Sequence, residues 1–344
     1  MDVDRACNFL FFVAQIANLS YMTTSSAPGK IILFGEHAVV YGRPALAIPV
    51  TQVHADVEIA DSDSTGILIH APSIHLHADL NSLPSDHPIA SVVHNFLFAS
   101  RIAPFPNLNI SITSTIPVAS GLGSGAAVTV ALVRALSSHL NYSMTDEDVN
   151  AFACDIEKLH HGTPSGIDNT VITYAKPVYF VKRLPSPSGR GAGGEGRVNT
   201  IEPFKVGSPF TIVVGDTGIS APTKESVTDV RKLWEADKAK WEGMFDEVGD
   251  IAKVAKERIE TGDWRLLGEL MNRNHELLQE MTVSSPELGR LVEAARKAGA
   301  AGAKLSGGGR GGNMIALAEP EKADDISSAL MSAGAKNTII TRVV

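Results

Sequence analysis

The sequence predicts an α+β protein of two domains, an N-terminal α/β domain and a C-terminal domain with ferredoxin-like alternation. Three observations support this prediction. Apolar segments of strand type fill residues 31–59, and a glycine-rich loop separates an alternating segment from an apolar one between residues 107 and 136. The second half alternates strand and helix signals in the order βα-ββα-β. A chain of 344 residues is long enough for one large domain or two ordinary ones.

The N-terminal half begins with predicted strands of a mixed sheet. They read KIILFGE from Lys30, PALAIPV from Pro44 and VHADVEIA from Val53, with YGRP at residues 41–44 as a turn. The segment NLNISIT (107–113) alternates strictly, which predicts a strand with one face toward solvent. The following AAVTVALVRAL (126–136) carries a single charged residue, so we expect a buried helix there.

A further helix is predicted to start at Thr145, where TDED offers an N-cap and an acidic first turn. It should end near HGTPSG (161–166), whose proline and glycines predict a loop. Residues 184–200 begin LPSPSGRGAGGEGR and contain few large apolar side chains, which predicts a flexible insertion. We therefore place the domains at 22–183 and 201–344.

The C-terminal half starts with a predicted strand, FTIVVGD, and continues with a long charged helical region from about Lys224 to Met281. In the next helix, Ser285 is the predicted N-cap, Pro286 the first helical residue and Gly299 the terminator. Two short strands, GAKLS and NMIALAE, flank GGGRGG. A helix from about Pro320 and a strand NTIITRV complete the pattern.

Composition excludes several classes of protein. The net charge of -8 and the absence of a Lys/Arg run argue against nucleic acid as a partner. Two cysteines give neither a disulfide framework nor a zinc spacing, which fits a reducing, cytoplasmic setting. The apolar segment FLFFVAQIA (9–17) is too short to span a bilayer, and we expect no membrane partner. Because Met22 resembles a natural start, we interpret residues 1–21 as a non-native or disordered extension.

The loop GLGSGAA (121–127) has two interpretations. A glycine loop that opens a helix can direct several backbone N–H groups at a phosphate, but the same glycines also permit a simple tight turn, which this stretch alone favours. A Walker loop is excluded because Ala126 follows Gly125. GLGSGA does match the dinucleotide fingerprint, yet the acidic residues about 20 positions later, 146–148, cap a helix instead of ending a strand.

Two charged residues elsewhere favour the phosphate interpretation. Lys30, in PGKIILFGEH, could reach a transferring phosphoryl group, although a lone lysine at a strand edge is usually solvated. Asp168, in HGTPSGIDN, is predicted to lie in a loop, where a lone aspartate usually forms a turn.

Glu157 is expected on a helix beside His160 and His161. A Glu-x-x-His metal half-site is conceivable, but a di-metal bundle needs a second copy, and the sequence has none. We therefore interpret the histidines as helix-end residues and Glu157 as a candidate ligand of Mg²⁺, which prefers oxygen.

Together these stretches resemble the three motifs of the GHMP kinases, the superfamily of galactokinase, homoserine kinase, mevalonate kinase and phosphomevalonate kinase. The motifs are PGKIILFGEHAVVYGRPALA, PVASGLGSGAA and KLSGGGRGG, in this order, and the resemblance spans about residues 27–344. Within the superfamily, GEHAVVYG, HGTPSGIDN and NHELLQEMTVSSPEL are most similar to mevalonate kinases. Phosphomevalonate kinases, sugar kinases and a non-catalytic nucleotide-binding homologue remain alternatives.

The resemblance implies a GHMP kinase fold that transfers the γ-phosphoryl group of ATP, with Mg²⁺, to the 5-hydroxyl of mevalonate. It implies that Asp168 and Lys30 are catalytic, that Glu157 and Ser124 hold the metal, and that Glu36 and His37 bind substrate. A homodimer is the assembly that we expect. The resemblance also implies which residues surround ATP: Pro117, Ala119, Ser120, Gly121, Leu122, Gly123, Ser124, Gly125, Ala126 and Ala127. It adds Gly307, Gly308 and Gly309 in the glycine loop of the third motif, the third glycine loop.

The chain departs from the family pattern at four positions. Mevalonate kinases commonly read GLGSSAA, so Gly125 stands where a serine hydroxyl would lie near Mg²⁺; Ser124 or a water could replace it. The third motif usually reads KLTGAGGGGC, and here Gly308, Arg310 and Asn313 replace Ala, Gly and Cys. Arg310 could contact phosphate or point to solvent.

Overall fold

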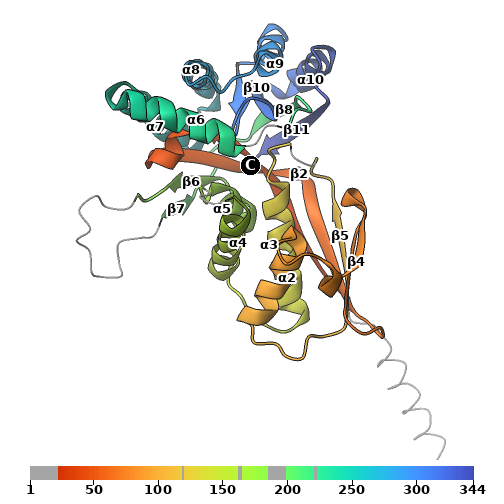
Figure 1. The fold of residues 1–344 in the computed structure, drawn as a ribbon. Coiled ribbons are helices and arrows are strands. Elements are labelled where there is room, and N and C mark those ends of the chain that lie inside the picture. The colour runs from red at the N-terminus through yellow and green to blue at the C-terminus, as the bar shows by residue number, and fades with distance from the viewer. Residues whose placement is uncertain (1–21, 118–119, 162–164, 185–198, 221–222) are drawn as a thin grey trace, which may run out of the picture. The chain divides into compact units, whose positions relative to one another are not determined.

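A computed structural model describes residues 22–117, 120–161, 165–184, 199–220 and 223–344. The predicted extension at 1–21 and most of the predicted insertion, residues 185–198, lie outside the described residues. The strands are β1 (Met22–Phe34), β2 (Pro44–Asp61), β3 (Ile67–Ala71), β4 (Leu76–Asp79), β5 (Leu108–Ser114), β6 (Val178–Val181), β7 (Thr200–Pro203), β8 (Phe210–Asp216), β9 (Gly302–Ser306), β10 (Asn313–Ala318) and β11 (Asn337–Val343). The α-helices are α2 (Pro88–Ala99), α3 (Ser124–His139), α4 (Asp146–His161), α5 (Ile167–Tyr174), α6 (Thr223–Ala236), α7 (Lys238–Thr261), α8 (Leu267–Glu280), α9 (Pro286–Lys297) and α10 (Ala323–Ser332) (Figure 1).

The chain divides into two compact units. Strands β1 and β2 and helix α3 each contribute residues to both units. The described part of the first unit comprises residues 22–26, 56–113 and 131–145, and the second comprises 27–55, 114–130 and the described residues from 146 onward. The strands of the N-terminal half pair in the order β4-β3-β5-β2-β6-β7, with β1 on β2. In the first unit, β3 is antiparallel to β4 and parallel to β5.

The C-terminal half contains a four-stranded antiparallel sheet in the order β11-β8-β10-β9. Since β8 is its first strand in the chain and β11 its last, this is the strand order expected of a βαββαβ unit, and it confirms the ferredoxin-like prediction. Four helices, α6 to α9, connect β8 to β9 where a minimal unit has one. Helices α8, α9 and α10 pack against this sheet (Figure 1).

Most predicted elements are present, with local differences. The strand β5 alternates as expected, with Leu108, Ile110 and Ile112 buried, and α3 is buried along most of its length. The strands predicted from Pro44 and Val53 form a single 18-residue strand, β2. The long charged helical region is divided into α6, α7 and α8, because Asp237 caps α7 and Gly262 ends it in a left-handed conformation.

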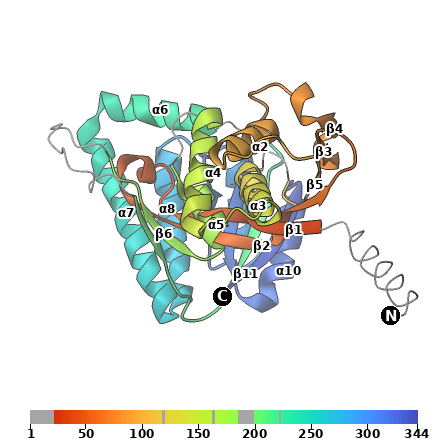
Figure 2. The same cartoon turned by 90° about the horizontal axis from the view of Figure 1, so that it is seen from below.

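The prediction for Asp168 was wrong in one respect. Gly166 adopts a left-handed conformation with φ of +87°, and α5 starts directly after it, so Asp168 lies in the first turn of a helix instead of a loop. An aspartate is favoured there because its negative charge is attracted by the positive end of the helix dipole. Helices α4 and α5 lie side by side (Figure 2), which brings the helix of Glu157 next to the helix of Asp168. No described helix is both long enough and apolar enough to cross a membrane.

Candidate active site

The glycine loop at 121–127 lies directly over the side chain of Lys30. Gly121 and Gly123 have φ angles of +82° and +79°, a region that favours glycine. A Cβ atom on Gly123 would lie 2.9 Å from Cγ of Lys30 and 2.8 Å from Cδ1 of Ile172. The N–H of Lys30 donates to the carbonyl oxygen of Leu122 at 2.9 Å, which fixes the loop to β1. Gly123 is therefore needed for close approach, and both Gly121 and Gly123 favour the left-handed conformation of the loop.

The same loop opens a helix, as the sequence predicted. Ser124, Gly125 and Ala126 form the first turn of α3, where backbone N–H groups lack partners within the helix. Gly125 is exposed, and a Cβ atom on it would meet nothing within 4 Å. Ala127 donates to the carbonyl of Gly123 at 2.9 Å. Of the other residues predicted around ATP, Pro117 is half-buried and Ala119 lies outside the described residues.

Lys30 and Asp168 form an ion pair beneath this loop. Nζ of Lys30 lies 2.9 Å from Oδ2 of Asp168, and the side chain of Lys30 is 5% exposed whereas that of Asp168 is 31% exposed. The lysine is thus almost enclosed, and the carboxylate reaches the surface of the site. A cation and a carboxylate of this kind can neutralise phosphoryl charge and accept a hydroxyl proton at the same place.

Glu157 belongs to the same charge cluster. The pKa of its carboxyl is raised from 4.5 to about 8, mainly by burial and also by the nearby Asp168 carboxylate, while Lys30 acts in the opposite direction. Burial and repulsion by Asp168 thus disfavour the ionised form of Glu157. A divalent cation bound to these two carboxyl groups would reduce the repulsion and favour the ionised form. No group of three or more His, Cys, Asp or Glu side chains is placed to hold a metal ion within the described ranges.

Glu36 and His37, predicted on the substrate side, are both buried. Glu36 forms an ion pair with Lys304 of β9, and neither side chain has any exposed surface. Burial raises the pKa of Glu36 and lowers that of Lys304, while each partner opposes the shift of the other. Nζ of Lys304 also donates to the carbonyl of Leu305 at 2.7 Å. This pair joins the first motif to the third through the interior of the second unit.

His37 contacts the third glycine loop through its ring. Nε2 of His37 lies 3.1 Å from the carbonyl oxygen of Gly308, and the residue has a φ angle of +60°. The pKa of His37 is lowered to about 4, mainly by burial; the hydrogen bond to Gly308 acts in the opposite direction, and the charge of Arg310 adds to the lowering. His37 is therefore neutral at pH 7, and its Nε2–H donates a hydrogen bond to the carbonyl of Gly308.

The third glycine loop also requires its glycines. Gly307 and Gly309 have φ angles of +93° and +77°. A Cβ atom on Gly308 would lie 2.9 Å from Oγ1 of Thr223, the first residue of α6. A Cβ atom on Gly309 would overlap the carbonyl oxygen of Val283. The loop is thus packed between α6 and the segment that follows α8.

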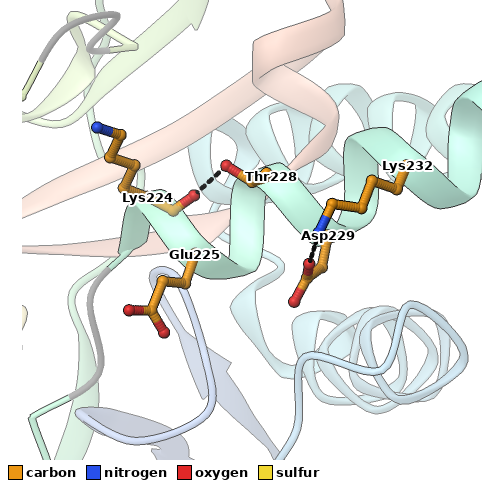
Figure 3. A pocket seen from close by; sticks show the side chains of 5 residues that line it. All are labelled: Lys224, Glu225, Thr228, Asp229 and Lys232. Atoms are coloured by element: carbon orange, nitrogen blue, oxygen red, sulfur yellow. Dashed lines mark hydrogen bonds and ion pairs between the residues drawn. The ribbon is translucent and has the colours of Figure 1, made fainter.

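Arg310 binds an aspartate of α6. Its Nη1 lies 2.6 Å from Oδ2 of Asp229, and its own N–H donates to the carbonyl of Val283 at 2.7 Å. Asp229 also lines a shallow hollow of about 280 Å³ along α6 (Figure 3). The residues around this hollow are Lys224, Glu225, Thr228, Asp229 and Lys232. The guanidinium of Arg310 is thus paired with a protein carboxylate, and its side chain is 34% exposed. A phosphate contact of Arg310 stays a prediction.

Two residues of the site, Ser306 and His275, were not singled out by the sequence, and a third, Asn313, was noted only as a departure from the family pattern. Ser306 donates from Oγ to the carbonyl of Ile32 at 2.8 Å and accepts from the N–H of Ile32 at 3.1 Å. Nδ1 of His275 accepts from the N–H of Leu305 at 3.3 Å, and burial lowers the pKa of His275 to about 4. Asn313 donates from its amide to the carbonyl of Ser120. Ser306 and Asn313 lie at the two ends of the third glycine loop, and this position was the available signal.

Two family models match this chain. The model of the GHMP kinase N-terminal domain matches residues 89–176, and that of the GHMP kinase C-terminal domain matches residues 255–336. These ranges lie on either side of the predicted domain boundary at 184–200, which itself stays a prediction.

Relatives that match nearly the whole chain indicate which kind of GHMP kinase it resembles. The chain is 37% identical to a mevalonate kinase of Pyrococcus horikoshii over 337 residues, 93% of this chain and 95% of that protein. It superimposes on the structure of L. major mevalonate kinase in complex with R-mevalonate with a TM-score of 0.80 at 30% identity, covering 94% of this chain and 97% of that one.

A phosphomevalonate kinase of Streptococcus pneumoniae, described in complex with phosphomevalonate and AMPPNP, shares the fold with a TM-score of 0.77 at 20% identity, over 93% of this chain and 99% of that one. The TM-score alone does not separate the two kinds of kinase, whereas the sequence identity does. By its family matches and its relatives, the chain belongs to the GHMP kinase family and, within it, to the mevalonate kinases.

Proposed function

We propose that this protein is an ATP-dependent mevalonate kinase that transfers the γ-phosphoryl group of ATP to the 5-hydroxyl of mevalonate. The observation that carries the proposal is the Lys30–Asp168 ion pair beneath a glycine loop that opens α3. The whole-length relationship to mevalonate kinases supports the choice of alcohol.

Asp168 acts on the alcohol in this mechanism. Its partly exposed carboxylate accepts the proton of the attacking hydroxyl, or orients that hydroxyl, as phosphorus–oxygen bond formation proceeds. Transfer breaks the bond between the γ-phosphorus and the bridging oxygen of ATP and releases ADP. The ion pair with Lys30 keeps the carboxylate in one place throughout.

Lys30 and the glycine loop act on the phosphoryl group. Phosphoryl transfer is catalysed mainly by positioning and by neutralising charge on the phosphoryl oxygens. The Lys30 ammonium is nearly enclosed, so water screens its charge little. The N–H groups at the start of α3 add hydrogen-bond donors and the positive end of a helix dipole.

Mg²⁺ is the cofactor that we propose, held by Glu157 and by Ser124 in the first turn of α3. When bound, the metal supplies positive charge to the phosphate oxygens of ATP. The raised pKa of Glu157 fits this assignment, because a cation would favour the ionised carboxylate that burial and Asp168 disfavour.

We also propose a cytoplasmic location, since two cysteines provide no disulfide framework. Mevalonate and ATP are the proposed substrates, and the homodimer remains a prediction that the sedimentation behaviour of the purified protein would test.

The function is tested by measuring ADP release with Mg·ATP and a panel of alcohols: mevalonate, phosphomevalonate, homoserine and galactose. We expect mevalonate to give a kcat/KM far above that of the other alcohols. Efficient ADP release with one of the others and none with mevalonate would overturn the proposal. ATP binding without turnover on any alcohol would instead indicate a non-catalytic homologue.

A further inference from the structure

Asn313 occupies a rigid position at the end of the third glycine loop. It is the first residue of β10, where it pairs with Ser306 of β9 on one side and Asp216 of β8 on the other. The residue is 1% exposed. A central strand held on both sides fixes the direction of its side chain.

That side chain contacts Ser120, directly before the glycine loop at 121–127, which is the proposed ATP loop. Nδ2 of Asn313 donates to the carbonyl oxygen of Ser120, and a Cβ atom on Gly121 would lie 3.7 Å from the same nitrogen. Ser120 is itself 4% exposed, and its hydroxyl donates to the carbonyl of Pro117 at 2.8 Å. Asn313 therefore supports the peptide that joins Ser120 to Gly121.

The planarity of the peptide bond gives this contact a consequence for the loop. In a trans peptide the carbonyl oxygen and the following N–H point in opposite directions, so a donor that holds the oxygen of Ser120 also orients the N–H of Gly121. The bond from the N–H of Lys30 to the carbonyl of Leu122, at 2.9 Å, does the same for the N–H of Gly123. Two alternate peptides of the loop are thus fixed by donors outside it.

We propose that Asn313 is a positioning residue that fixes the N–H groups of this loop in the orientation that binds the phosphates of ATP. It does not touch the nucleotide and acts through Ser120. The family pattern has cysteine at this position, and a thiol is a weaker donor than an amide. The proposal rests on the proposed function, because it assumes that the loop binds ATP.

The test uses full-length Asn313→Cys and Asn313→Asp variants. Asn313→Cys substitutes the family residue, and Asn313→Asp keeps the shape but replaces the donor with a carboxylate that repels the carbonyl of Ser120. Thr23→Val is the matched control, since it removes another buried side-chain hydrogen bond, 3.0 Å to Nδ1 of His139. Binding of a non-hydrolysable ATP analogue with Mg²⁺ is measured by calorimetry, together with Tm and the KM for each substrate.

We expect Asn313→Cys to weaken analogue binding about tenfold, or about 1.4 kcal/mol, and Asn313→Asp to weaken it more. The KM for mevalonate should stay within about twofold. Thr23→Val should lower Tm without changing analogue binding.

Analogue binding by both Asn313 variants at the affinity of the unaltered protein would overturn the proposal, as would a loss that Thr23→Val reproduces. The measurement needs no alcohol. An unaltered protein that binds the analogue but does not phosphorylate mevalonate would contradict the proposed function and leave the comparison of variants valid. An unaltered protein that binds no analogue would contradict both.

Discussion

At the scale of single residues, the ion pair between Lys30 and Asp168 is the chemical centre of the account. A buried ammonium and a partly exposed carboxylate 2.9 Å apart can act on the phosphoryl group and the alcohol together. Neither residue stood out alone in the sequence. The fold brings the two side chains together, because Asp168 lies in the first turn of α5 and reaches Lys30 of β1.

Asp168→Asn should lower kcat by about 10²–10⁴-fold, because an amide cannot accept the proton of the alcohol. The KM for ATP should change little, since Asp168 is assigned to the alcohol. Steady-state kinetics with Mg·ATP measures both quantities. Asp155→Asn, which removes an exposed ion pair with Lys158 on α4, is the control and should leave kcat unchanged. An Asp168→Asn variant as fast as the unaltered protein would remove Asp168 from the mechanism.

Glu157 predicts a specific pH dependence of stability. Its pKa is raised to about 8 in the folded protein, whereas an unfolded glutamate titrates near 4.5. Between these values the folded state binds the extra proton, so without metal Glu157 should contribute stability at low pH that is lost as pH rises toward 8. In Glu157→Gln this contribution should be absent.

Urea unfolding in EDTA from pH 5 to pH 9 measures the difference. Glu293→Gln, at an exposed site on α9 whose glutamate pKa lies below its usual value, should show the pH slope of the unaltered protein. The assignment fails if Glu157→Gln shows that slope as well.

At the scale of elements, the sequence predicted the positions of the two glycine loops but not their contacts. The strand β9 and the helix α9 lie where their apolar spacing and capping residues predicted them. The elements β3, β4, α2, β6 and β7 were not predicted.

Contacts between distant elements could not be predicted at all. Lys304 and Glu36 are 268 residues apart, and no spacing rule connects them. Both lie in recognisable motifs, but only the folded chain shows that they neutralise each other in the interior. Asn313 and Ser120, 193 residues apart, are a second case.

Gly125 allows a test of the first turn of α3. The family commonly has serine here, and the structure leaves open space for a side chain at this position. Gly125→Ser should lower the Mg²⁺ concentration that gives half-maximal activity, because it restores an oxygen ligand. Gly125→Ala is the matched control, since both variants replace the glycine in the first turn of α3 but only serine adds a hydroxyl. A Mg²⁺ requirement that shifts equally in both variants would refute the ligand role.

At the scale of the whole molecule, the residues with assigned catalytic roles come from stretches far apart in the chain but belong to one compact unit. Residues 27–55, 114–130 and those from 146 onward make up this unit. It contains Lys30, the ATP loop, Glu157, Asp168 and the third glycine loop. The three ordered motifs that the sequence displayed therefore lie together in one unit, where the Glu36–Lys304 pair and the Asn313–Ser120 hydrogen bond connect them.

The most direct test of the account is identification of the phosphorylated product by ³¹P NMR after incubation with Mg·ATP and mevalonate. We expect one new phosphate monoester, on the 5-hydroxyl, formed in equal amount to ADP and strongly reduced in Asp168→Asn. A mevalonate sample that stays unphosphorylated while the same protein phosphorylates phosphomevalonate or a sugar would contradict it.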